Sequence, residues 1–77
     1  MRIEILGPGC AKCNLLAQHA EEAAQSMGLD YEIVKVTALP DILARGVMST
    51  PAMAVDGILK VQGHVPTSRN IGKMLST

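Results

Sequence analysis

Apolar and polar residues change their spacing along the chain in a way that predicts alternating strands and helices. Residues 1–6 alternate as a strand does, with Ile3 and Ile5 on one side and Glu4 and Leu6 on the other. Residues 11–27 follow a helical pattern. In that segment apolar side chains recur every three or four positions, at Leu16, Ala20, Ala23, Ala24 and Met27. Gly28 follows at the place where a helix commonly ends.

The rest of the chain contains five further segments with regular patterns. They are a strand at residues 31–36, a short helix at 39–45 before Gly46, strands at 53–55 and 58–61, and a C-terminal helix beginning at Pro66-Thr67. Asp56-Gly57 between two apolar runs predicts a tight hairpin, because both residues tolerate positive φ. Thr67 is the expected N-cap. We expect the last helix to bury Ile71, Met74 and Leu75.

The order of these elements, β-α-β-α-β-β-α, indicates an α/β fold in a single domain over residues 1–77. The first two strands are joined through a helix, which allows a parallel, right-handed crossover. The last two strands form an antiparallel hairpin. We therefore predict a four-stranded mixed sheet with helices on both faces.

Composition and charge exclude several classes of function. The 77 residues include seven Lys or Arg and seven Asp or Glu, and Tyr31 is the only aromatic residue. Nucleic-acid binding needs a basic face and, for single strands, aromatic platforms, so we expect no nucleic-acid partner. No apolar run approaches the length of a membrane span, and residues 1–6 do not resemble a signal peptide. A cytoplasmic monomer is the expectation.

Cys10 and Cys13, the only cysteines, stand between the first strand and the first helix. A disulfide across two intervening residues closes a very short loop and so stabilises a fold little. Backbone N–H groups at a helix N-terminus favour an anion, and the thiolate is the nucleophilic form of cysteine. We therefore expect Cys10 to attack a substrate disulfide and Cys13, one turn further in, to resolve the mixed disulfide.

Two charged residues near the cysteines are weaker candidates for a role. Lys12 places positive charge close to the pair, although an exposed ammonium has a small effect. Glu4 is the only nearby carboxylate that could assist proton transfer. We interpret Glu4 as an exposed strand residue beside Arg2.

Metal binding is the main alternative use of the cysteine pair. A structural zinc site needs four ligands, and only His19 and His64, which we expect at the solvated surface, could complete one. We therefore expect no metal site and no cofactor. Soft-metal carriers for copper or zinc also place C-x-x-C between a strand and a helix. They follow the order β-α-β-β-α-β and usually carry Met where this chain has Pro8.

The whole chain resembles the thioredoxin superfamily in its smallest, glutaredoxin-sized form. The resemblance rests on the segment from Gly7 to Cys13, on Thr50-Pro51 and on Asp56-Gly57. It is closest to small thioredoxin-like proteins called redox-active disulfide proteins. The resemblance implies a thiol–disulfide oxidoreductase that acts on protein disulfides and is reduced by a separate reductase. A thioredoxin-like binding module without turnover remains an alternative.

The resemblance also implies structural details. Thr50-Pro51 is expected to be cis and to lie against the cysteines, and the strand order is expected to be 2-1-3-4. The Thr50 backbone is expected to pair with a bound peptide, and Gly9, Ala11 and Lys12 to help position it. Gly9 replaces the Trp of typical thioredoxins and Ala11-Lys12 replace Gly-Pro, which leaves the redox potential open.

The methionines are expected in two kinds of place, the hydrophobic core and the surface near the cysteines. We expect Met27, Met53 and Met74 to fill gaps in the core. Met48 lies near Pro51 in the sequence, and two interpretations stay open: a contact with a substrate, or a partly exposed loop residue.

Overall fold

The computed structural model describes residues 1–76 and contains four strands and three helices within them. In chain order these are β1 (Arg2–Leu6), α1 (Ala11–Ser26), β2 (Glu32–Val36), α2 (Leu39–Ala44), β3 (Ala52–Val55), β4 (Ile58–Gln62) and α3 (Ser68–Leu75). The predicted order is confirmed, and the predicted bounds differ by only one or two residues. No helix in this part of the chain is both long and apolar enough to cross a membrane.

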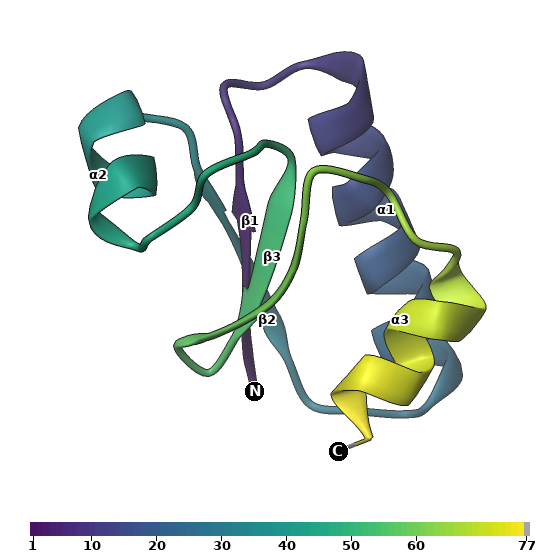
Figure 1. Ribbon diagram of the computed structural model, residues 1–77. Helices are drawn as coiled ribbons and strands as arrows, with labels where there is room; N and C mark the ends of the chain where they lie inside the picture. The colour runs from purple at the N-terminus through teal and green to yellow at the C-terminus, as the bar shows by residue number, and fades with distance from the viewer. Residues whose placement is uncertain (77) are drawn as a thin grey trace.

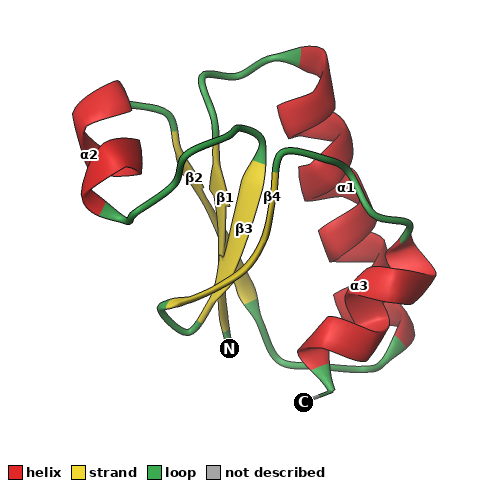
Figure 2. Cartoon of the chain, in the orientation of Figure 1, coloured by secondary structure: helices red, strands yellow, loops and turns green. Residues whose placement is uncertain are grey.

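The strands form one mixed sheet in the order β2-β1-β3-β4 (Figure 2). β1 pairs with β2 in parallel and with β3 in antiparallel orientation, and β3 and β4 form the antiparallel hairpin. Helices α1 and α3 cover one face, whereas α2 lies on the other (Figure 1). This is the mixed sheet of thioredoxin-like order expected from the sequence.

Each sheet face has its own apolar cluster. Ile3 and Ile5 pack toward α1 and α3 with Leu16 and Ile71, and all four are at most 2% exposed. Leu6 points to the opposite face, because successive strand residues alternate. On that face it packs with Ile42 of α2, with Val47 and with two residues of β3, Ala52 and Ala54. A central strand buried on both faces needs apolar residues at nearly every position.

The local signals in the sequence act as predicted. At the hairpin, Asp56 and Gly57 adopt φ of 50° and 85°. The Asp56 carboxylate also accepts a hydrogen bond from the Arg2 N–H at 2.8 Å, which ties the turn to β1. Thr67 caps α3 by accepting the Asn70 N–H at 3.2 Å. Gly28 ends α1 with a φ of 66°.

The predicted core place of Met27 is wrong. Met27 is 40% exposed, because α1 ends at Ser26 and Met27, its C-cap, already belongs to the exposed turn that contains Gly28. Met53 is fully buried as expected. Met74 is only partly buried beside the larger cluster, whereas Ile71 and Leu75 form the buried face of α3.

Candidate active site

Cys10 is the N-cap of α1 and directly follows the loop at residues 7–9. Its backbone is extended, with φ −70° and ψ 169°, and its carbonyl accepts the Asn14 N–H at 3.0 Å. The Cys10 Sγ accepts a second hydrogen bond, from the Cys13 backbone N–H at 3.3 Å. The sulfur therefore takes the position of a capping oxygen, where the unpaired N–H groups of the first turn favour negative charge.

Cys13 lies one turn further along α1 and is buried, whereas Cys10 is exposed. Space for the Cys13 sulfur exists because residue 7 is glycine. A Cβ added to Gly7 would overlap with Cys13 Sγ, and it would lie 3.8 Å from Pro51 Cα. Gly7 thus lies between Cys13 and Pro51. The sequence indicates only a break at Gly7-Pro8-Gly9, and this close approach depends on the folded loop.

The two thiols have opposite pKa shifts. Hydrogen bonds from Cys13, first from its thiol and then from its backbone N–H, lower the pKa of Cys10 below its ordinary value. Burial raises the pKa of Cys13, and its hydrogen bond to Cys10 raises it further. Since only the thiolate is strongly nucleophilic, this arrangement favours a reactive Cys10 and a protonated Cys13 near neutral pH.

The residues that flank the thiols are exposed and shape the loop. Gly9 has a φ of 90°, a conformation that side chains other than glycine rarely adopt. Ala11 and Lys12 begin α1 with both side chains exposed. The Lys12 backbone N–H is among the groups that lower the pKa of Cys10. Lys12 therefore acts on the thiol through its position in the first turn.

Thr50 and Pro51 lie on the segment that leads into β3. The peptide bond between them is cis, as the resemblance implies. Pro51 is buried next to Gly7 and Thr50 is exposed. The structure therefore brings Cys13 and Pro51 together beside Gly7, with Cys10 hydrogen-bonded to Cys13, and leaves Thr50 open to solvent.

Residues 1–76 match the family model described as thioredoxin domain. The chain belongs to the thioredoxin family. It is 42% identical over 76 residues to a thioredoxin of Methanothermobacter thermautotrophicus, with 99% of each chain covered. It is 37% identical over 75 residues to a thioredoxin of Methanocaldococcus jannaschii, with 97% of this chain and 86% of the relative covered. Membership in the thioredoxin family supports thiol–disulfide oxidoreductase as the general class of activity.

Glu4 was expected to be an exposed strand residue, and this expectation is wrong, because Glu4 is buried. The Glu4 side chain is 3% exposed and forms an ion pair with Arg45, while the Arg2 Nε lies 3.9 Å away. Glu4 points to the same face as Leu6, opposite to α1, because Ile3 and Ile5 occupy the α1 face. Arg45 lies 41 residues away in the sequence, so no local spacing could have revealed the pair.

The two histidines differ in burial. His19 is half-buried rather than solvated, since its Nδ1 lies 2.9 Å from the Pro66 carbonyl oxygen. His64 is exposed, as expected. Within residues 1–76, no three His, Cys, Asp or Glu side chains form a group that could hold a metal ion.

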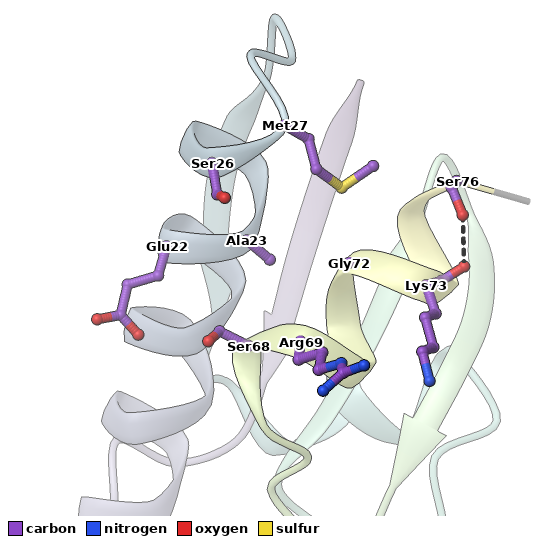
Figure 3. Close-up of a pocket in the computed structure, with 9 residues that line it drawn as sticks. All are labelled: Glu22, Ala23, Ser26, Met27, Ser68, Arg69, Gly72, Lys73 and Ser76. Carbon is purple, nitrogen blue, oxygen red and sulfur yellow. Dashed lines mark hydrogen bonds between the residues drawn. The ribbon is translucent and has the colours of Figure 1, made fainter.

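A surface hollow of about 490 Å³ lies away from the thiols, between the end of α1 and α3 (Figure 3). Glu22, Met27, Arg69 and Lys73 are among its lining residues. These α1 residues are more than two turns from Cys13, at the opposite end of the helix from the N-cap. The hollow therefore takes no part in thiol chemistry.

Proposed function

We propose that this chain reduces protein disulfides by two-step thiol exchange, with Cys10 as the attacking thiol and Cys13 as the resolving thiol. The observation that carries the proposal is the asymmetry of the pair. Cys10 is an exposed N-cap with a lowered pKa, and Cys13 is buried with a raised pKa. Membership in the thioredoxin family supports the same class of reaction.

In the first step, the Cys10 thiolate attacks one sulfur of the substrate disulfide. A bond forms between Cys10 Sγ and that sulfur, and the second substrate sulfur leaves as a thiolate and takes a proton from water. In the second step, Cys13 loses its proton and attacks Cys10 Sγ, which releases the first substrate sulfur. The two protein thiols supply two electrons and end as a Cys10–Cys13 disulfide.

The substrate disulfide and the electron donor both belong to other molecules that must bind at this site. We propose that an extended peptide beside the substrate disulfide pairs with the Thr50 backbone next to Pro51. Gly9, Ala11 and Lys12 form the other exposed border of the thiol. A separate reductase then returns the Cys10–Cys13 disulfide to two thiols, and this cycle suits a reducing compartment such as the cytoplasm.

Reduction of insulin, with dithiothreitol as the electron donor, tests the proposal. We expect the wild-type protein to accelerate the reaction and Cys10→Ser to abolish the acceleration, because the attacking sulfur is lost. Incubated with insulin in the absence of dithiothreitol, Cys13→Ser should attack once and stall as a mixed disulfide on Cys10, visible as an added mass that a later addition of dithiothreitol removes.

Two other outcomes would contradict the proposal. A soft-metal carrier should bind Cu(I) tightly, reduce insulin poorly and lose binding equally on either Cys→Ser substitution, because each removes one thiolate ligand. A binding module should fold normally but give no acceleration with dithiothreitol and no mixed disulfide in Cys13→Ser. Each result assigns the pair a different role.

A further inference from the structure

The segment at residues 47–51 connects α2 to β3 and ends at the candidate site. Val47 anchors its start, since that side chain is only 2% exposed in the cluster beside α2. Met48 follows and is 86% exposed, more than the other large apolar side chains with outward positions. The segment therefore passes from the core to the surface within one residue, just before Thr50 and Pro51.

The side chain of Gln62 holds this segment by its backbone. Gln62 is the last residue of β4, and its Oε1 accepts the Met48 N–H at 2.9 Å and the Ser49 N–H at 3.4 Å. Both partners are donors, so the group that faces them is the amide oxygen, whose two lone pairs can accept two hydrogen bonds. One side chain thus fixes two consecutive peptide units.

The next residue, Gly63, holds the other side of Thr50. The Gly63 N–H donates to the Pro51 carbonyl at 2.9 Å, and a Cβ at Gly63 would lie 3.2 Å from Ser49 Cβ. The Thr50 N–H and carbonyl, in contrast, have no hydrogen-bond partner among residues 1–76. Gln62 and Gly63 therefore hold the chain by hydrogen bonds before and after Thr50, an arrangement that we call the clamp. The peptide groups of Thr50 itself stay free to bind another chain.

We propose that Gln62 is a positioning residue that presents the Thr50 backbone to the peptide flanking the substrate disulfide. The inference rests on the proposed function, since it concerns how that site receives its substrate. A segment already held in its binding conformation loses less entropy when a partner binds. Gln62 thereby acts on substrate binding through Met48 and Ser49, without contact with either thiol.

Steady-state reduction of insulin by Gln62→Met tests the inference, because Met keeps the length of the side chain and loses the acceptor. We expect KM to rise by about fivefold, the effect of about one net hydrogen bond, with kcat nearly unchanged. Dithiodipyridine, a small disulfide without a peptide backbone, should react with Cys10 at the wild-type rate. Gln62→Glu should restore KM, because a carboxylate oxygen accepts the same two N–H groups.

Gln25→Met is the matched control, since Gln25 is an exposed residue of α1 whose side chain also makes surface hydrogen bonds. It should leave KM for insulin unchanged. Amide hydrogen exchange at Met48 and Ser49 should accelerate in Gln62→Met and return to the wild-type rate in Gln62→Glu. These amides report on the clamp independently of turnover.

An unchanged KM in an active Gln62→Met variant would overturn the inference. Equal slowing with insulin and dithiodipyridine, or a failure of Gln62→Glu to restore KM, would also overturn it, because the effect would then not arise at the peptide. Failure of the proposed function looks different. In that case the wild-type protein itself would not reduce insulin.

Discussion

Cys10 and Cys13 are chemically identical side chains that their surroundings make different. Cys10 receives hydrogen bonds from the thiol and the backbone N–H of Cys13, and both favour the thiolate. The Cys13 thiol is buried beside Gly7, and the loss of contact with water disfavours its thiolate. The asymmetry of the pair follows from the helix cap and from one missing side chain.

Replacement of Cys13 by alanine separates these causes. Cys13→Ala removes the thiol donor, which is the largest cause of the lowered Cys10 pKa, so the pKa should move upward toward its ordinary value. Alkylation of Cys10 should then require a higher pH, because less thiolate is present at any pH below the pKa. Cys13→Ser keeps a hydroxyl donor and should shift the profile less. The initial rate of iodoacetamide modification as a function of pH measures these shifts, and identical profiles for the wild type and Cys13→Ala would contradict the assignment.

Gly7→Ala tests the space beside Cys13. The added Cβ would overlap with Cys13 Sγ, so the thiol or the loop must move, at a cost of about 1–3 kcal/mol in the free energy of unfolding. Formation of the Cys10–Cys13 disulfide should also slow. Urea unfolding and the rate of oxidation by a small disulfide measure both effects.

Gly72→Ala is the control for this substitution. A Cβ there would meet only Met27 Sδ, at an ordinary 3.5 Å, inside helix α3. Alanine in a helix interior is favoured over glycine by up to about 1 kcal/mol, so this variant should be as stable as the wild type or more stable. Equal losses in the two variants would show that Gly7 has no special packing role.

At the scale of elements, the central position of β1 and the alternation of its side chains determine which residues lie close together. This strand lies in the interior of the sheet, so β2 and β3 pair with its two edges, while α1 and α3 cover one of its faces and α2 covers the other. Ile3 and Ile5 point to the α1 side and Glu4 to the α2 side, where Arg45 at the end of α2 pairs with it. The ion pair raises the pKa of Arg45 and ties α2 to the sheet. It does not reach the thiols of α1.

Glu4→Gln therefore should not alter thiol chemistry. We expect the pH profile of Cys10 alkylation to match that of the wild type, since the carboxylate is on the other face of the sheet. Stability should fall, because Arg45 loses its ionised partner. Alkylation rates together with urea unfolding check the two expectations. A displaced pH profile would assign Glu4 a part in proton transfer after all.

At the scale of the molecule, two small aliphatic clusters must stabilise a chain with a single aromatic residue. A domain of this length has a free energy of unfolding of about 4–12 kcal/mol. Leu16 is fully buried at the centre of the larger cluster and connects α1 to the sheet. Loss of one such side chain therefore removes a large share of the stability.

Leu16→Ala should lower the free energy of unfolding by about 2–5 kcal/mol, as expected for a buried leucine that leaves a cavity. The neighbouring Leu15 is 43% exposed, so Leu15→Ala should cost less than about 0.5 kcal/mol. The midpoint of urea unfolding compares the two variants. Similar losses would indicate that α1 packs on the sheet through a different face.

Local signals explain why much of the fold could be predicted. Asp56-Gly57, Gly28 and Thr67 act through the conformations of one to four consecutive residues, and all three act as predicted. The place of Cys10 at the start of α1 is equally local, because it depends only on the residues that begin the helix. The burial of Met27 was predicted wrongly, since the spacing of apolar residues does not reveal at which residue the helix ends.

The sequence alone determined the order of elements, the turn positions and the place of Cys10 and Cys13 at the start of α1. Tertiary structure decided the burial of Glu4, the fit of Cys13 beside Gly7 and the contact of Gln62 with Met48 and Ser49. The reason is physical. Backbone propensities act between neighbours in the chain, whereas burial and long-range hydrogen bonds exist only after the sheet brings distant residues together.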